Sequence, residues 1–469
     1  MVVIATFAIS FSAAAKEMPN VDALRVNAEH GDAQAQASLG EAYANGEGVA
    51  RNFTAAFKWF HKAAEQGDAN AQDNLGALYM KGLGVAKNEA TAVKWYRKAA
   101  DQGVARAQYN LGLSYVYGQG VAKDKAVATK WFRKAAEQGY VMAQYSLGVL
   151  YDRGDGVIKD EAAAVKWYRK AAEQGVVQAQ YNLGAMYGGG FGVARDQTAA
   201  AKWFLKAGEL GFAPAQSSLG FIYYNGEGVK KDEVAAAQWF RKAADQGDAE
   251  AQYNLGKMYE TGEGVAMDKA AAAKWYRNAA EQGYAMAQSN LANFYEHGDG
   301  VARDKAAAAK WYRNAAEQGN ANAQYNLGIF YLNGDGVTKD EAEAAKWFRK
   351  AADQGYVKAQ FNLGIAYDNG DGVAKDQALA TKWYRMAADL GDANAQFNLS
   401  SNFAHGTGVP RNLEQACYWL SLARPDAMQP DAERDKACAQ LDSAQRDAVM
   451  VKVAEAQSQL KHRTSESKP

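Results

Sequence analysis

Proline is almost missing from this chain, which contains only 6 prolines in 469 residues. Because proline interrupts helices and restricts the residue before it, its scarcity removes a common obstacle to helical structure. Glycine, in contrast, occurs 45 times, and alanine is abundant. This composition favours helices that end at glycine turns over sheets or disordered segments.

An excess of positive charge is missing as well. Lys+Arg and Asp+Glu each total 53, so the formal net charge is zero. A protein that binds nucleic acid normally carries a basic excess or stripe that neutralises phosphates. The composition therefore predicts no nucleic-acid partner.

Cysteine is limited to Cys417 and Cys438, both near the C-terminus. In an oxidising compartment these two residues can form a disulfide. Two buried free thiols are an equal alternative, since free cysteine packs as a small hydrophobe. The sequence leaves both possibilities open.

Long apolar runs are absent except for a short one at the N-terminus, residues 2–11, followed by the small residues 12–15. The run is too short to span a bilayer comfortably, and small residues before Lys16 suit signal peptidase. We therefore expect a signal peptide at residues 1–15, export to the periplasm or outside the cell, and no stable membrane insertion after cleavage. No basic residue precedes the run, so an uncleaved anchor or a cytoplasmic chain is the alternative.

One motif, Ala-Gln-x-x-Leu-Gly, recurs through most of the chain at a fixed interval of 36 residues. All 11 tryptophans share a second position of the same period. An unbroken period of this kind is the signature of a repeat architecture. We predict an all-α fold, an α/α superhelical solenoid of eleven helix-turn-helix repeats over residues 32–427. The leucines are Leu39, Leu75, Leu111, Leu147, Leu183, Leu219, Leu255, Leu291, Leu327, Leu363 and Leu399.

Residues 104–139 show how one unit is built. The apolar positions of its first half recur at helical spacing, and Gly112 among them suggests close approach of a partner helix. Gly118 suits a helix C-terminus, and Asp124 suits the N-cap of a second helix. Trp131 lies on the apolar stripe of that second helix, so we expect the tryptophans to belong to the core.

The ends of the array read as caps. Residues 16–31 resemble the end of a second helix and predict an N-terminal capping half-repeat. Residues 428–460 predict C-terminal capping helices, and residues 461–469 predict a disordered polar tail.

The unit Ala-Gln-Tyr-Asn-Leu-Gly…Gly-x-Gly-Val…Trp-Tyr-x-Lys-Ala-Ala-x-Gln-Gly resembles the Sel-1-like repeat, a relative of the tetratricopeptide repeat. The resemblance implies a superhelical adaptor that scaffolds protein complexes. A cysteine-rich branch of that family carries a disulfide in each repeat, and this chain lacks those cysteines. Any enzymatic activity associated with that branch is therefore not carried over.

Nothing in the sequence gathers catalytic or metal-binding groups. The five histidines occupy different repeats at different positions, with no pair at ligand spacing. The Gly-x-Gly-Val loops lack the flanking strand and Lys-Ser/Thr of a phosphate-binding loop. We expect no enzyme activity, no cofactor and no metal site.

Two series of positions on the first helix are candidates for partner contact. The first is an aromatic ladder, which can grip an extended peptide or can simply pack between repeats: Tyr109, Tyr145, Tyr181, Tyr253, Tyr325 and Phe361. The second series follows the Leu-Gly pair and varies between copies. It forms apolar patches if it faces the groove, and it belongs to the core if it faces the neighbouring helix. Its candidate members are Leu113, Val149, Phe221, Ile329 and Ile365.

These observations predict a non-enzymatic, exported scaffold that binds a protein or peptide on the concave solenoid face. Carbohydrate or cell-wall binding through the aromatic ladder is the alternative, and a hydrolase with an unrecognised site is a third. The repeats encode a shape, so the partner itself stays unidentified.

The export hypothesis can be tested at the N-terminus of the mature protein. If signal peptidase removes residues 1–15, Edman sequencing of the protein from its native host begins at Lys16. A mature chain that begins at Met1 would contradict cleavage.

Overall fold

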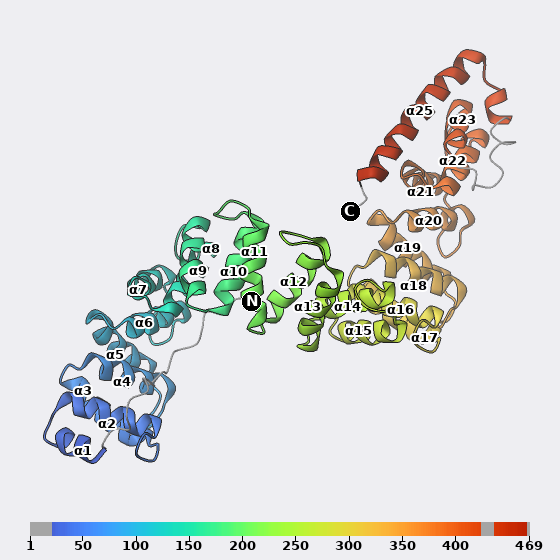
Figure 1. The fold of residues 1–469 in the computed structure, drawn as a ribbon. Helices are drawn as coiled ribbons and strands as arrows, with labels where there is room; N and C mark the ends of the chain where they lie inside the picture. The colour runs from blue at the N-terminus through green and yellow to red at the C-terminus, as the bar shows by residue number, and fades with distance from the viewer. Residues whose placement is uncertain (1–20, 424–435, 467–469) are drawn as a thin grey trace. The chain divides into compact units, whose positions relative to one another are not determined.

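The computed structural model describes residues 21–423 and 436–466 (Figure 1). The signal peptide predicted at residues 1–15 lies outside the described residues. The chain divides into two compact units at Trp239 and Phe240, and each is built by the same rule of antiparallel helix pairs in chain order. Within the described ranges every regular element is a helix, which confirms the all-α solenoid repeats expected from the 36-residue period.

Each repeat contributes two helices, and nearly all span 13 residues. The first unit contains α1 (Val21–Glu29), α2 (Ala33–Asn45), α3 (Phe53–Glu65), α4 (Ala69–Lys81), α5 (Glu89–Asp101), α6 (Ala105–Tyr117), α7 (Lys125–Glu137), α8 (Val141–Arg153), α9 (Glu161–Glu173), α10 (Val177–Gly189), α11 (Gln197–Glu209) and α12 (Ala213–Asn225). Then α13 (Glu233–Asp245) carries the boundary.

The second unit repeats the pattern and ends in a longer helix. It contains α14 (Ala249–Thr261), α15 (Lys269–Glu281), α16 (Ala285–His297), α17 (Lys305–Glu317), α18 (Ala321–Asn333), α19 (Glu341–Asp353), α20 (Val357–Asn369), α21 (Gln377–Asp389), α22 (Ala393–His405), α23 (Leu413–Leu422) and α25 (Ser443–Glu466).

Helix ends follow the sequence signals. Asp124 caps α7 by accepting hydrogen bonds from the backbone N–H groups of Ala126 and Val127, both at 2.9 Å. Gly118 ends α6 with φ of 73°, a left-handed conformation that glycine adopts without strain. A Cβ on Gly120 would lie 2.2 Å from the carbonyl oxygen of Glu89 in the preceding repeat. The second loop glycine therefore lets each loop rest on the neighbouring helix start.

Within a repeat, the two helices meet where an aromatic ring covers a glycine. A Cβ on Gly112 would lie 2.5 Å from Phe132, so only glycine leaves room for the ring. The same ring-on-glycine contact, with hypothetical Cβ distances of 2.5–3.1 Å, recurs in the pairs Gly40–Phe60, Gly76–Tyr96, Gly148–Tyr168, Gly184–Phe204, Gly256–Tyr276, Gly328–Phe348 and Gly364–Tyr384. This confirms the close helix approach predicted from Gly112.

Between repeats, tryptophan closes the junction. Trp95 packs against the buried cluster of the preceding repeat, and Trp131 does so one repeat later. The rings range from half-buried to buried, with Trp383 only 6% exposed. A lysine three residues on lies over several of them, as Lys98 lies 4.2 Å from the centroid of Trp95. The tryptophans therefore belong to the core as predicted, but at its edge.

A pair of glutamines joins the two helices of a repeat and bonds to the preceding repeat. The buried Gln108 donates to the carbonyl oxygen of Ala100 at 3.1 Å and accepts from Gln138 at 2.8 Å. The donor always stands 30 residues after the acceptor, in the pairs Gln66–Gln36, Gln102–Gln72, Gln138–Gln108, Gln174–Gln144, Gln282–Gln252, Gln318–Gln288 and Gln354–Gln324. Each buried amide is thereby satisfied on both its oxygen and its nitrogen.

Single helices lie at the two ends of the array. Helix α1 precedes the first helix pair, and its Val21 and Ala28 are buried against α2. At the C-terminus Val449 and Val453 are buried in one cluster with Leu422, whereas Val451 is 60% exposed. The disordered tail predicted at residues 461–469 is wrong up to Glu466, where α25 ends, because the helix continues. Residues 424–435 and 467–469, which include parts of both predicted segments, lie outside the described residues.

The two cysteines form a disulfide. Cys417 on α23 is bonded to Cys438, with their Cα atoms 5.0 Å apart. The bond ties the short helical turn at residues 436–439 to the last repeat. By closing a loop of 21 residues it contributes about 3 kcal/mol in the chain-entropy account.

Two repeats break the glutamine pairing, and this yields a stability prediction. Leu210 and Leu390 replace the donor, and among the described residues the Oε1 atoms of Gln180 and Gln360 are buried acceptors without a hydrogen bond. Both leucines are exposed, at 61% and 48%. Leu210→Gln and Leu390→Gln should each raise the free energy of unfolding by about 1 kcal/mol, because each restores a donor to a buried acceptor.

Urea denaturation followed by circular dichroism measures this gain. Leu210→Ala is the matched control, since it removes the exposed leucine without adding a donor. Equal midpoints for the Gln and Ala variants at position 210 would show that the glutamine pair contributes nothing.

Candidate functional site

The aromatic ladder lies mostly below the surface. Tyr109 and Tyr145 are buried, so a partner cannot reach these rings, and their nomination as contact residues is corrected. The other members are half-buried: Tyr181, Tyr253, Tyr325 and Phe361. The series is therefore a packing ladder with a partly accessible edge in the later repeats.

Neighbouring aromatic rings pack against the rings of the ladder. Tyr253 lies between Tyr276 and Tyr284, with ring centroids 5.8 and 5.3 Å away. Tyr181 is enclosed in the same way by Phe204 and Phe212, at 5.5 and 5.4 Å. Tilted and edge-on aromatic contacts at such separations are favourable in themselves. These ring contacts therefore hold adjacent helix pairs together.

Asparagine side chains of the next repeat bond to two of the ladder tyrosines. Burial raises the pKa of Tyr145 to about 12, and a hydrogen bond from Asn182 in the next repeat opposes this rise. Tyr253 and Asn290 form the same pairing, and burial again raises the pKa of the tyrosine. The hydroxyls of Tyr145 and Tyr253 therefore stay protonated at neutral pH and bond across the junction.

The variable series changes character along the chain. Leu113 and Val149 are buried, at 0% and 1% exposure, so these two candidates belong to the core, which is one of the two alternatives left open above, and a partner cannot reach them. Phe221, Ile329 and Ile365 are half-buried. The same position is exposed as Ala185, Lys257 and Asn293 in three other repeats. The later copies of this position therefore reach the surface.

A small cavity lies beside this second patch. It has a volume of about 80 Å³ and opens between α18, α19 and α20. Leu332, Phe348 and Ile365 give it an apolar lining, and Glu341 and Asp371 lie at its border. Of the predicted contact residues, Ile365 alone is among those that line this cavity.

Eleven consecutive segments match the family model described as Sel1 repeat: residues 33–68, 69–104, 105–140, 141–176, 177–212, 213–248, 249–284, 285–320, 321–356, 357–392 and 393–424. The chain belongs to the Sel1 repeat family. Proteins of this family are generally protein-interaction scaffolds, and the fold is typically non-catalytic.

Solved structures agree with this assignment. The chain is similar to a protective antigen present in uropathogenic Escherichia coli strains that displays an SLR fold, with 39% identity over 96% of this chain and 98% of that chain and a TM-score of 0.85. It is also similar to a Sel1 repeat protein from Oxalobacter formigenes, with 36% identity over 70% of this chain and 92% of that chain and a TM-score of 0.55. A comparison with curated proteins finds no match.

One Sel1 repeat departs from the ladder in a way that the sequence reading missed. Asp73 occupies the ladder position and is fully buried, and Arg106 of the next repeat forms an ion pair with it. Burial would lower the pKa of Arg106, but the charge of Asp73 raises it. Asn110 also donates to Asp73, at 3.2 Å. The sequence did carry a signal, since Asp73 is an acid at a position that is aromatic in most other repeats. The role of Asp73 is to join two repeats.

Catalytic and metal-binding groups are sparse in the described ranges. No three His, Cys, Asp or Glu residues there gather around a point that could hold a metal ion. Ser401 and His405 lie within 3.4 Å, but Nδ1 of His405 is 2.9 Å from the carbonyl oxygen of Ser401 and must donate its proton there. That nitrogen is not available as a base for the serine. None of the described helices is long and apolar enough to cross a bilayer.

Proposed function

We propose that this Sel1 repeat protein is an exported, non-enzymatic scaffold that binds a protein or peptide on the concave face, through the first helices of its later repeats. The observation that carries the proposal is the apolar cavity beside Ile365. Shared positions hold the repeats together, so selectivity has to come from positions that differ between copies.

Ile329 and Ile365 are the half-buried apolar members of the variable series that lie in adjacent repeats of one unit. They lie on α18 and α20 at the same repeat position, and both are half-buried. Exposed neighbours at that position, such as Asn293, are polar. A partner segment with apolar side chains would bind at the two isoleucines and not at the polar positions. Such anchor side chains in small pockets dominate the binding energy of most interfaces.

Two observations support export. The disulfide between Cys417 and Cys438 is the kind of bond that persists in an oxidising compartment. The similar Escherichia coli protein is described as a protective antigen. Carbohydrate binding through the ladder has no comparable support, because Tyr109 and Tyr145 are buried and two neighbouring rings pack against Tyr253.

The proposed surface can be tested with charge substitutions at one repeat position. Ile329→Glu and Ile365→Glu each place a charge where an apolar anchor would be desolvated, and each should weaken partner binding at least tenfold. Affinity capture from periplasmic extract identifies the partner, and titration of the purified partner by calorimetry measures the loss.

Asn293→Glu is the matched control, since it adds the same side chain at the same repeat position on an exposed site. It should leave the affinity unchanged, and circular dichroism should show all three variants folded. Unchanged affinity in both isoleucine variants would remove this surface from the account.

A further inference from the structure

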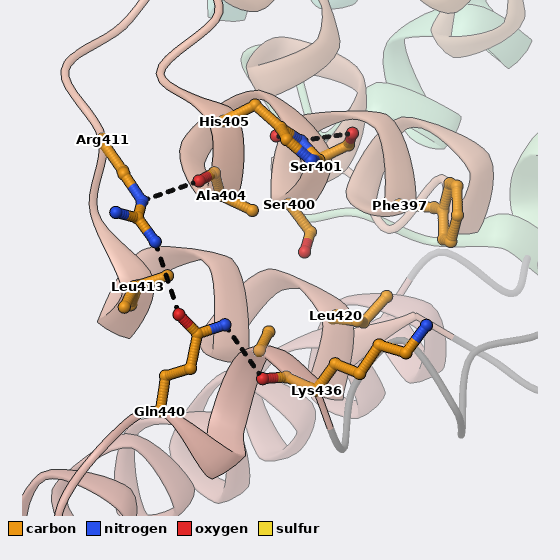
Figure 2. Close-up of a pocket in the computed structure, with 11 residues that line it drawn as sticks. Phe397, Ser400, Ser401, Ala404, His405, Arg411, Leu413, Leu420, Lys436 and Gln440 are labelled. Atoms are coloured by element: carbon orange, nitrogen blue, oxygen red, sulfur yellow. Dashed lines mark hydrogen bonds between the residues drawn. The ribbon is translucent and has the colours of Figure 1, made fainter.

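The last repeat contains a cavity that the scaffold function does not use. It has a volume of about 260 Å³ and lies between α22, α23 and the turn at residues 436–440 (Figure 2). Ligand sites for larger molecules occupy about 300–1,000 Å³. The cavity is therefore sized for a small molecule or for one residue of a peptide.

A change in the repeat pattern creates this space. In the other ten repeats an aromatic residue follows the repeat tryptophan, and in eight of them it lies on the glycine of the first helix. The last repeat instead has Leu420 after Trp419 and Ser400 in place of the glycine. Ser400 uses part of the vacated space to donate to the carbonyl oxygen of Ala416 at 2.8 Å. The remaining space is the cavity.

The charges of its lining have one sign. Arg411 and Lys436 are permanent cations, and His405 also lines the cavity (Figure 2). None of the described residues that line the cavity is acidic. Phe397 and Leu420 add an apolar wall. A cavity that combines an apolar wall with cations complements a carboxylate attached to an apolar group.

The cationic side is held in place. Nε of Arg411 donates to the carbonyl oxygen of Ala404 at 3.0 Å, and its Nη2 donates to Gln440 at 3.3 Å. The turn that carries Lys436 and Gln440 also carries Cys438, which is bonded to Cys417 on α23. A wall fixed by hydrogen bonds and a disulfide loses little conformational entropy when a ligand binds.

We propose that this cavity is a binding site for a carboxylate that bears a compact apolar group. A free aryl- or alkyl-carboxylic acid and the C-terminal residue of a peptide share this chemistry. The site is separate from the cavity beside Ile365, so loss of either proposal leaves the other in place.

Calorimetric titration of the whole protein with N-acetyl-L-phenylalanine, which mimics a peptide C-terminus, tests the proposal. The acid should bind saturably, and its amide should bind at least tenfold more weakly, because the amide lacks the charge that Arg411 and Lys436 complement. 3-Phenylpropionate, titrated in parallel, represents a free carboxylic acid. Tighter binding of N-acetyl-L-phenylalanine would indicate a peptide C-terminus as the ligand, and tighter binding of 3-phenylpropionate would indicate a free acid.

The double variant Ser400→Gly with Leu420→Phe restores the pattern of the other repeats and fills the cavity. It should abolish binding while its melting temperature stays at or above that of the native protein. Arg411→Gln should weaken binding of the acids at least tenfold. Arg303→Gln, at the same position of another repeat and with the same bond from Nε to a carbonyl oxygen at 2.9 Å, should have no effect.

Three results would overturn the site. These are no saturable binding of either acid, equal binding of the acid and its amide, or undiminished binding by the filled double variant.

Discussion

In most repeats the two helices approach so closely that an aromatic ring lies directly on a glycine of the facing helix. A Cβ at Gly328, for example, would lie 2.6 Å from Phe348. This contact sets the separation of the two helices in a repeat. Because that separation is fixed, each tryptophan and each glutamine pair contacts the preceding repeat at the same place. Cohesion between neighbours then propagates along each unit as in other repeat proteins.

The proposed binding sites lie where the repeats depart from their shared pattern. Ser400 and Leu420 replace the glycine and the ring, and a cavity opens in the last repeat. Ile329 and Ile365 vary a position that is core in earlier repeats and reaches the surface in later ones. Leu210 also departs from the shared pattern. Its side chain cannot donate to Gln180, so a hydrogen bond is lost and no new site is evident in its place. A regular array thus gains individual sites through single substitutions at shared positions.

The sequence predicted the architecture closely because identical spacing repeated eleven times leaves few alternatives. It could not decide which ladder rings are buried. Tyr109 and Tyr253 occupy the same position with the same residue, yet only Tyr109 is buried, since exposure depends on neighbours in adjacent repeats. The cavity in the last repeat escaped for a similar reason. Leu420 departs visibly from the aromatic residue of the other repeats, but its meaning depends on Ser400, which lies 20 residues earlier and contacts the same helix.

The ring-on-glycine contact can be tested by a double-mutant cycle in an intact repeat. Gly364→Ser, Tyr384→Leu and the double variant copy the last repeat into its neighbour, where a Cβ at position 364 would lie 2.6 Å from the ring. The free energy of unfolding of each protein is measured in urea. If the ring and the glycine constrain each other, the serine costs less when the ring is absent, with a coupling energy of about 1 kcal/mol or more. Additive effects, within about 0.5 kcal/mol, would contradict the account.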